Sequence, residues 1–398
     1  MKKIAIMGYG TVGSGVAEAL SISRDQIAAR IGDTVVPAKI LDLRDFPGDP
    51  FEDRIIHDVN LILEDPEIEV VVETMGGLHP AYEFTKQAIT AGKSVVTSNK
   101  QLVEAFGAQL AKLAEEKGVS YLFEASVAGG IPILRTINTA MIQEKIEEIN
   151  GILNGTTNYI LDLMENAGAD FEEALQDAKD HGFAERDSRA DVDGLDAARK
   201  LAIMGSMACS RHIFFEDIRT RGIRDITLQD MQAAEVMNGR IKLIASYSRQ
   251  NDKTFATVEP MFLPSRHPLA NVNGVYNAVM IRSSLLGDSL YYGKGAGKLA
   301  TASAVVADVL AVLDGSKREM NIWSNKKEPL QPTYGIPANY MLRVQGMQLE
   351  NSLFSDTQPI QGGYAALTYS CSDDELQELL DQINQCAEVR SVFRVLEM

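Results

Sequence analysis

The segment from His181 to Met204 contains side chains that could hold an amino group and move a proton. Its first half carries carboxylates on Glu185, Asp187, Asp191 and Asp193. Asp196 and Lys200 follow at a spacing of i and i+4, which would place both on one face of a helix. A lysine ammonium can stabilise developing negative charge on an oxygen and deliver a proton, and carboxylates can bind a substrate ammonium. The pattern predicts such a site, although an ordinary surface ion pair fits the same spacing.

An amphipathic helix is expected to carry this lysine. Apolar side chains recur at helical spacing on Leu195, Ala198, Leu201 and Ala202. Asp191 and Asp193 precede them and suit the N-cap of that helix. A second polar segment, residues 154–159, is rich in hydroxyl and amide groups and precedes another helical pattern. It suits contact with a substrate or a cofactor, for instance through Thr156, or simple helix capping.

The N-terminal third carries the fingerprint of a dinucleotide-binding unit. Lys3 to Met7 is a short apolar strand that runs directly into a glycine-rich turn and then a helical pattern. The first glycine of such a turn allows a sharp bend, the second lets the backbone approach a pyrophosphate, and the third lets helix and strand pack closely. N–H donors and a favourable dipole then meet the phosphates at the start of the helix. The predicted phosphate-binding residues are Gly8, Gly10, Thr11, Val12 and Gly13.

The end of the second predicted strand, residues 35–43, bears on the choice of cofactor. Asp42 could bind the ribose 2′-hydroxyl of NAD, whereas Arg44 could accept the 2′-phosphate of NADP. The two residues have the same parity on a strand, so both could face the ribose unless Arg44 already lies in the loop. The choice between NAD and NADP stays open at this point.

Further strand–helix units predict a doubly wound parallel sheet of the Rossmann type. Ligands bind outside the carboxyl ends of the strands in such a sheet. The polar residues expected along that rim are Thr74, Ser98, Asn99, Lys100 and Glu124. A second glycine-rich turn, residues 291–297, precedes a predicted helix at 301–313, and its Gly295 could again face the cofactor.

Four segments are predicted along the chain. Residues 1–130 form the Rossmann-type domain with a returning helix at 301–315, residues 131–300 form a second α+β domain, residues 316–332 form a charged linker with prolines, and residues 333–398 form a small α+β module. Within the second domain we expect a helix at Thr227–Ser246 and strands at Thr257–Phe262 and Ala278–Arg282. Within the last module we expect strands at Tyr340–Val344, Tyr364–Tyr369 and Val389–Leu396, and a helix at Asp373–Cys386.

The composition argues against several classes of function. The formal net charge is −17, from 38 Lys and Arg against 55 Asp and Glu, so neither nucleic acid nor an anionic membrane is expected as a partner. The 3 cysteines and 5 histidines are dispersed, which favours neither a disulfide framework nor a zinc site. No apolar run approaches the roughly 18 residues of a membrane span, and no signal peptide precedes the first strand, so a cytoplasmic protein is expected.

Several motifs together resemble the homoserine dehydrogenase family over residues 4–313. They are GYGTVGSGV, VVETMGG, VVTSNK, FEASVAGGIPI, NGILNGTTNYIL, GFAERDSRADVDGLDAARKLAI and GKGAGKLATASAVVADV, in the family's order and spacing. The resemblance implies NAD- or NADP-dependent interconversion of L-homoserine and L-aspartate 4-semialdehyde, in threonine, methionine and isoleucine biosynthesis. It also implies a homodimer or larger homo-oligomer, assembled through the second domain. The alternatives are another amino-acid dehydrogenase on the same scaffold and a catalytically silent paralogue that binds the cofactor.

Roles for individual residues follow from the resemblance. Lys200 is similar to the lysine that exchanges a proton with the substrate's γ-oxygen, and Asp196 lies beside it. Lys100 resembles a second lysine near cofactor and substrate. Glu185 and Asp191 resemble the acidic groups that hold the substrate's α-ammonium.

The resemblance further implies a structural monovalent cation, usually sodium, and a regulatory tail. The matching cation loop contains Glu124, Val127, Gly129 and Ile131. The tail resembles a shortened ACT-like module, because the first turn and helix of a βαββαβ pattern are not evident between Val344 and Tyr364. We therefore expect control by threonine to be weakened, absent or altered. Arg186, Arg189 and Lys294 add charge to otherwise matching motifs, which leaves cofactor preference and substrate affinity open.

Overall fold

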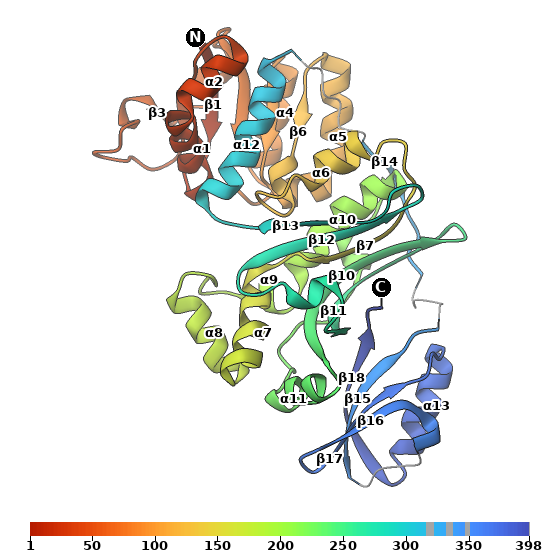
Figure 1. Cartoon of the computed structure of the whole chain (residues 1–398). Helices are drawn as coiled ribbons and strands as arrows, with labels where there is room; N and C mark the ends of the chain where they lie inside the picture. The colour runs from red at the N-terminus through yellow and green to blue at the C-terminus, as the bar shows by residue number, and fades with distance from the viewer. Residues whose placement is uncertain (316–321, 332–336, 347–350, 398) are drawn as a thin grey trace. The chain divides into compact units, whose positions relative to one another are not determined.

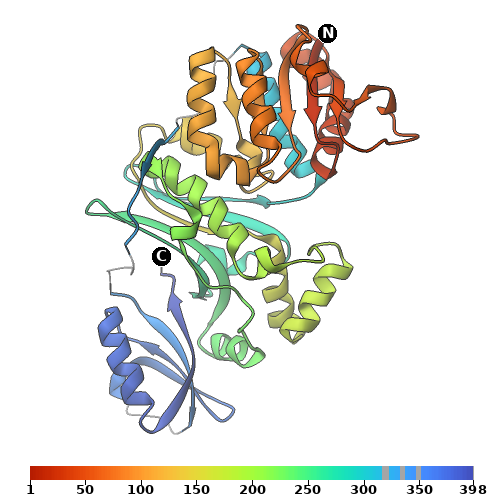
Figure 2. The same cartoon turned by 180° about the vertical axis from the view of Figure 1, so that it is seen from behind.

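The computed structural model describes residues 1–315, 322–331, 337–346 and 351–397 (Figures 1 and 2). The chain packs into two compact units. Unit 1 comprises Met1–Lys145, Ala202–Phe214 and Gly293–Glu328, and unit 2 comprises Ile146–Leu201, Phe215–Tyr292 and Pro329–Met398. The finer division into two domains, a linker and a C-terminal module remains a prediction.

Unit 1 is built on a parallel sheet, as the Rossmann-type pattern predicted. Its strands are β1 (Lys2–Met7), β2 (Val35–Leu41), β3 (Ile55–Ile56), β4 (Ile68–Glu73), β5 (Ser94–Thr97) and β6 (Tyr121–Leu122), in the order β3-β2-β1-β4-β5-β6. The strand order reverses between β1 and β4, which is where such sheets bind their ligands. Strands β1 and β4 are nearly continuous apolar runs because both faces of the sheet are buried.

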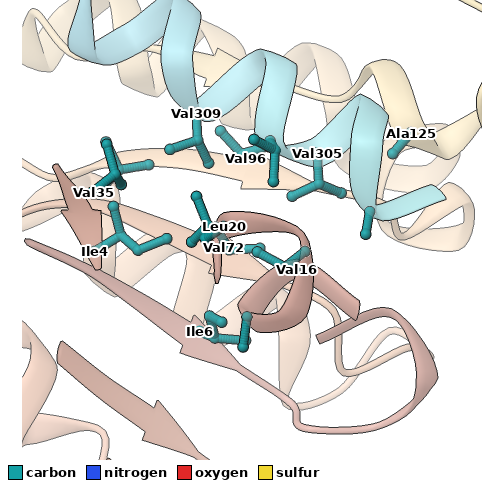
Figure 3. Packing of buried hydrophobic residues seen from close by; sticks show 14 of the residues in the cluster. Ile4, Ile6, Val16, Leu20, Val35, Val72, Val96, Ala125, Val305 and Val309 are labelled. Atoms are coloured by element: carbon teal, nitrogen blue, oxygen red, sulfur yellow. The ribbon is translucent and has the colours of Figure 1, made fainter. Parts of the chain in front are cut away.

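Helices cover the two faces of this sheet. They are α1 (Thr11–Ile22), α2 (Arg24–Ile31), α3 (Asn60–Leu63), α4 (Ala81–Thr90), α5 (Lys100–Lys117) and α12 (Lys298–Leu313). Figure 3 shows Val305 and Val309 of α12 packed with Val16 and Leu20 of α1 against the sheet, and all four are at most 2% exposed. Gly15 permits this close approach, since a Cβ there would lie 2.7 Å from the carbonyl oxygen of Lys298.

The remaining elements of unit 1 are η2 (Glu124–Ser126), α6 (Ile133–Arg135), η3 (Thr136–Ala140), η1 (Glu52–Arg54), β8 (Arg211–His212) and β14 (Ser324–Lys327). Part of the predicted linker at 316–332 has regular structure, because β14 pairs with β8. Trp323 is 2% exposed and its indole N–H donates to Nδ1 of His212 at 2.9 Å. One aromatic side chain thus fixes a segment whose charges and prolines are typical of a linker. Residues 316–321 and 332 lie outside the described residues.

Unit 2 is organised around a mixed sheet of ten strands in the order β13-β12-β7-β10-β11-β18-β15-β17-β16, with β9 also paired to β11. The strands are β7 (Ile146–Ile152), β9 (Arg219–Thr220), β10 (Gly239–Gln250), β11 (Lys253–Pro264), β12 (Tyr276–Ser283), β13 (Gly287–Lys294), β15 (Tyr340–Gly346), β16 (Phe354–Ile360), β17 (Gly363–Thr368) and β18 (Ala387–Val395). The helices are α7 (Gly155–Ala167), α8 (Phe171–Asp180), α9 (Arg189–Val192), α10 (Leu195–Cys209), α11 (Leu228–Val236) and α13 (Asp373–Ile383), with η4 (Phe215–Asp217), η5 (Pro268–Asn271) and η6 (Asn351–Leu353). Helix α10 continues from unit 2 into unit 1 at Ala202.

The prediction of helical structure over Thr227–Ser246 is wrong beyond Val236. Helix α11 ends there, Asn238 adopts a positive φ of 54°, and β10 begins at Gly239. A Cβ on Gly239 would lie 2.2 Å from the ring of Phe262, so only glycine fits. Strand β10 is paired on both edges and mostly buried on both faces, which removes the alternation that would identify a strand in the sequence.

The C-terminal strands extend this sheet, and α11 and α13 cover opposite faces of them (Figure 1). The predicted strands that became β15, β17 and β18, and the predicted helix that became α13, are confirmed within a few residues. Strand β16 was not predicted, because its sequence FSDTQPI is polar and contains a proline. Between β15 and β16 the described residues form a single 3₁₀ turn and no α-helix, and residues 347–350 lie outside them. None of the described helices is long and apolar enough to cross a membrane.

Candidate active site

Lys200 lies on α10 in unit 2, buried and held by two oxygens. Its Nζ donates to the carbonyl oxygen of Leu153 at 2.7 Å and forms an ion pair with Oδ2 of Asp196, also at 2.7 Å. The predicted pairing of the lysine with the carboxylate one turn earlier is therefore present. An ammonium has three N–H donors, and the described residues take two of them. The third donor is available for an oxygen of a bound molecule.

Asn154 connects the carboxylates of the site, a role that the sequence did not reveal. Its amide nitrogen donates to Oδ1 of Asp191 at 2.7 Å and to Oδ2 of Asp196 at 2.9 Å. Its amide oxygen accepts from the backbone N–H of Thr157 at 2.9 Å and so caps α7. A neutral amide has both the donors and the acceptor for these three bonds. The amide therefore fixes Asp191 and Asp196 without adding charge.

The predicted N-cap of α10 by Asp191 or Asp193 is wrong. Gly194 precedes the helix with a φ of 82°, and its carbonyl accepts from the N–H of Ala198 at 2.9 Å. Asp191 lies inside the short helix α9, and Asp193 pairs with Arg224. The left-handed glycine lets one helix end and the next begin at a new angle, so Asp191 is directed to Asn154.

Two other residues expected to bind substrate occupy different surroundings. Thr156 is buried, and its hydroxyl donates to the carbonyl oxygen of Phe183 at 2.5 Å, which ties α7 to the acidic loop. Glu185 is exposed in that loop and has no hydrogen bond or ion pair with any residue that the structure describes. The structure thus brings Lys200, Asp196 and Asp191 together and leaves Glu185 outside their network.

The first glycine turn of unit 1 fits a dinucleotide phosphate. Gly8 has a φ of 95°, and Thr74 donates to its carbonyl oxygen at 2.8 Å. A Cβ on Gly13 would lie 1.9 Å from that same oxygen, so glycine is required there. Helix α1 begins after Gly10 without a side-chain cap. The N–H groups of its first turn, from Thr11 onward, are therefore oriented for an anion.

Asp42 and Arg44 lie just beyond β2, which ends at Leu41, so of the two alternatives the structure has Arg44 in the loop. The guanidinium of Arg44 donates to both oxygens of Asp42 at 3.0 and 3.1 Å, and the N–H of Tyr9 donates at 2.8 Å. Partial burial raises the pKa of Asp42, but these hydrogen bonds outweigh it and hold the pKa at about 2. The Arg44 side chain is 63% exposed. Asp42, a possible acceptor for a 2′-hydroxyl, and Arg44, a possible cation for a 2′-phosphate, therefore lie in contact with each other.

The carboxyl end of β5 carries the other residues expected at the rim. Asn99 caps α5 by accepting from the N–H of Leu102 at 3.2 Å, and its amide donates to the carbonyl oxygen of Gly77 at 2.7 Å. Ser98 and Lys100 flank Asn99, and both are half-buried. Because β4 and β5 are neighbours in the sheet, Thr74 and Ser98 lie on the same edge of unit 1.

The loop predicted to bind a cation is closely packed. The buried Glu124 carboxylate accepts from the N–H groups of Leu134 at 3.0 Å and Arg135 at 2.6 Å, so it caps α6. Burial, followed by the charge of Asp308, raises the pKa of Glu124 to about 8. The backbone carbonyls of this loop, such as those of Val127, Gly129 and Ile131, are further candidate ligands. Within the described residues, no group of three or more His, Cys, Asp or Glu side chains is placed to hold a metal ion.

The second glycine turn is shorter than predicted, because residues 291–294 belong to β13. Its Gly295 packs against Gly129, where a Cβ would lie 2.5 Å from the Gly295 carbonyl oxygen. The N–H of Gly130 also donates to the carbonyl oxygen of Lys294 at 3.1 Å. Gly295 therefore has a packing role in unit 1 beside any contact with a cofactor.

Known proteins match the chain along nearly its whole length. Residues 8–124 match the family model of the homoserine dehydrogenase NAD-binding domain, and residues 132–310 match that of homoserine dehydrogenase. The homoserine dehydrogenase of Bacillus subtilis is 33% identical over 99% of this chain and 98% of its own. The crystal structure of a homoserine dehydrogenase from Thiobacillus denitrificans is 31% identical, with a TM-score of 0.89 over 99% of this chain and 98% of that one. A hyperthermophilic archaeal homoserine dehydrogenase, solved in complex with NADPH, is 28% identical, with a TM-score of 0.67 over 80% of this chain and 99% of that one. The chain belongs to the homoserine dehydrogenase family.

Proposed function

We propose that Lys200 exchanges the proton in the reaction of this family, the NAD(P)-dependent interconversion of L-homoserine and L-aspartate 4-semialdehyde. A bound nicotinamide would supply or accept the hydride. As the aldehyde is reduced, negative charge develops on its oxygen, which an ammonium stabilises and then protonates. In the opposite direction the neutral amine takes the proton of the homoserine hydroxyl. The observation that carries the proposal is the buried Nζ of Lys200, fixed by Leu153 and Asp196 with one N–H left over.

Neighbouring residues are assigned to positioning and to substrate binding. Asp196 holds the ammonium of Lys200 in place, and Asp191 provides a carboxylate for the substrate's α-ammonium. Glu185 is proposed to bind the same α-ammonium of the substrate. Its carboxylate is exposed and has no partner among the described residues. Lys100 is the second lysine of the reaction, and Thr156 contributes a hydroxyl oxygen that can accept a hydrogen bond.

The dinucleotide is assigned to the first glycine turn, with Thr74, Ser98 and Gly295 as further contacts. The uncapped start of α1 and the close packing of Gly13 on Gly8 fit a pyrophosphate at this turn. We propose that both NAD and NADP are accepted. Asp42 offers an acceptor to the 2′-hydroxyl, and Arg44 can leave Asp42 for a 2′-phosphate because its side chain is exposed. The complex of the archaeal relative with NADPH is consistent with this.

A structural sodium ion is assigned to the backbone carbonyls of the loop at residues 124–131. Two successive left-handed residues support it, Ala128 with φ 54° and Gly129 with φ 52°. A left-handed alanine costs about 1 kcal/mol, and such strain persists where the surroundings use the resulting backbone direction. The tail is assigned as a shortened ACT-like module in a cytoplasmic homodimer, with threonine control weakened or absent.

The test compares Lys200→Met with Lys253→Met. Methionine keeps the length of the side chain and removes the ammonium, and Lys253 is an exposed lysine of unit 2 that serves as the control. Formation of reduced cofactor is followed with homoserine and either NAD or NADP. We expect Lys200→Met to lower kcat by about 10²–10⁴ and to leave the Kd of the cofactor unchanged. Near-normal turnover in Lys200→Met, with the control also normal, would exclude Lys200 as the proton-transfer group.

A further inference from the structure

Strands β9 and β18 pair in succession with the same edge of β11. Strand β9 pairs in parallel at Thr257 and Val258, and β18 pairs in parallel at Met261 and Phe262. The opposite edge of β11 is occupied by β10 along its whole length, so both short pairings fall on the remaining edge. Glu259 and Pro260 lie in the interval between the two pairings. We call this interval, with the residues around it, the seam.

A cavity of about 160 Å³ opens at the seam. Its polar side chains are Arg219, Arg221, Glu259, Tyr340, Asp373 and Arg394. This volume is several times what one buried water requires, so it can accept a small molecule. Three guanidinium groups against two carboxylates give the cavity a positive excess, in a chain whose net charge is −17. A local excess of this sign favours an anion.

Arg219 and Arg221 have guanidinium N–H groups that can donate to a bound anion. The side chain of Arg219 forms no hydrogen bond or ion pair with any residue within the described part of the chain. Arg221 donates through Nη1 to the carbonyl oxygen of Val392 at 3.2 Å, and its guanidinium lies 5.3 Å from the ring centroid of Phe393. These contacts anchor Arg221 and use only part of its five N–H groups. A guanidinium fits carboxylate and phosphate oxygens with two parallel hydrogen bonds.

The acidic side chains of the cavity form no close ion pair with Arg219 or Arg221 in the described part of the chain. Arg219 and Arg221 attract Glu259, but within the described residues no ion pair of 4 Å or less joins either arginine to Glu259 or Asp373. Asp373 instead accepts from the hydroxyl of Tyr340 at 3.2 Å. Burial raises the pKa of Glu259, although the surrounding guanidinium groups lower it in part. A purely structural cluster of arginines would be expected to pair with the carboxylates beside it.

We propose that the seam binds a small anion, carrying a carboxylate or a phosphate, between Arg219 and Arg221 of the β9 segment and Arg394 of β18. The bound anion joins the two strands where they have no direct pairing with each other. It therefore stabilises the attachment of the C-terminal strands to β11.

The same segment contacts the turn that leads into the catalytic helix. Thr220 lies between the two arginines, and a Cβ on Gly194 would lie 2.9 Å from its Cγ2. The N–H of Ile223 donates to the carbonyl oxygen of Val192 at 2.9 Å, and Arg224 pairs with Asp193. An anion that orders Arg219 and Arg221 thus also steadies the start of α10. This second step rests on the proposed function of Lys200 and predicts a lower KM for homoserine when the anion is bound.

Calorimetric titration of the full-length protein tests the site directly. Inorganic phosphate and succinate are titrated separately, each with reduced cofactor bound so that the first glycine turn is filled. We expect saturable binding of at least one of them, and the stronger of the two identifies the preferred head group. Arg219→Met should weaken binding about tenfold, as expected for one charge-assisted hydrogen bond. Glu259→Gln should strengthen it several-fold because a negative charge is removed, and Arg266→Met, an exposed arginine away from the cavity, should leave it unchanged.

Absence of saturable binding for both anions would overturn the proposal, as would equal affinities for Arg219→Met and Arg266→Met. Hydrogen exchange gives an independent readout, since the anion should slow exchange of the β9 and β18 amides in the wild type and, at the same concentration, do so less in Arg219→Met. Unchanged exchange despite binding would place the anion elsewhere. The KM of homoserine decides the coupling separately, because loss of the Lys200 assignment would leave the calorimetric result intact.

Discussion

Replacing Asn154 with aspartate would test whether the catalytic carboxylates need a neutral bridge. The amide nitrogen of Asn154 lies 2.7 Å from Oδ1 of Asp191 and 2.9 Å from Oδ2 of Asp196. Asn154→Asp keeps the oxygen that caps α7 and substitutes an acceptor oxygen for the donor nitrogen. Three carboxylates would then meet beside the ammonium of Lys200.

The magnitude follows from these distances. Two unit charges about 2.8 Å apart at an effective dielectric constant of ~20 repel by roughly 6 kcal/mol. Protonating a carboxyl costs about 1.4 kcal/mol for each pH unit above its pKa, so near neutral pH a shared proton costs less than the repulsion. The folded variant should therefore retain one proton, shared by the introduced carboxyl group with those of Asp191 and Asp196. The apparent pKa of this group of carboxyls is raised well above that of the unfolded chain.

The pH dependence has a definite sign. A carboxyl whose folded pKa is raised stabilises the fold fully below its unfolded pKa, near 4, and loses this contribution as pH rises through the folded pKa. The Tm difference between wild type and Asn154→Asp should therefore widen from about pH 5 to pH 8. Asn154→Ala is the matched variant. It loses the cap, worth about 1 kcal/mol, and two charge-assisted hydrogen bonds, so it should be destabilised at every pH without such a trend.

Asn154→Asp should lower turnover as well as stability. The shared proton weakens the hold of Asp196 on Lys200, so kcat of Asn154→Asp is expected to fall about tenfold or more at neutral pH, in a protein that still binds cofactor. Thermal unfolding followed across pH, with steady-state kinetics at each point, measures both effects. A Tm offset for Asn154→Asp that stays constant with pH would refute the charge argument, because only steric misfit would then remain.

Three further predictions concern unit 1. Gly13→Ala should abolish cofactor binding in a fluorescence titration with reduced cofactor, because its Cβ would lie 1.9 Å from the carbonyl oxygen of Gly8; a normal Kd would contradict the packing argument. Arg44→Ala should raise the Kd of NADP about tenfold and leave the Kd of NAD within a few-fold of its normal value, since Asp42 still accepts the hydrogen bond from the N–H of Tyr9. Equal losses of affinity for both cofactors would contradict the assignment. Because the folded pKa of Glu124 is about 8 against an ordinary 4.5, the stability from its protonated form is lost as pH rises through 8. Glu124→Gln should therefore flatten the fall of Tm between about pH 5 and pH 8, and an unchanged slope would show that another group titrates there.

Local patterns predicted the parts of the fold in which neighbours in sequence are neighbours in space. The strand, glycine turn and helix of residues 2–22 are such a case, because Gly8 and Gly13 meet within one turn. Strand β10 was missed because its burial on both faces is decided by β7 and β11, which lie elsewhere in the chain. Trp323 was missed as an anchor for a similar reason, since its partner His212 is 111 residues away.

In the candidate site, too, local contacts could be predicted and contacts between distant segments could not. The spacing of Asp196 and Lys200 predicted their ion pair, because one helical turn fixes it. The bridge through Asn154 could not be predicted, because it spans 37 residues to Asp191 and 42 to Asp196. The sequence marked residues 154–159 for contact with a ligand or for helix capping, and capping accounts for one of the three bonds of Asn154. The other two depend on where β7 ends relative to α9 and α10.

The position of Lys200 depends on close approaches around the turn between α9 and α10. A Cβ on Gly222 would lie 2.2 Å from the carbonyl oxygen of Val192, and Gly194 is similarly close to Thr220. Larger residues at either glycine would push the 219–224 segment away from the turn, and the start of α10 would follow. Fixing an ammonium within a few tenths of an ångström of its oxygens requires that helix start to be rigid. The acidic loop therefore supplies the reactive groups, but contacts from β7 and from the β9 segment determine whether they can act.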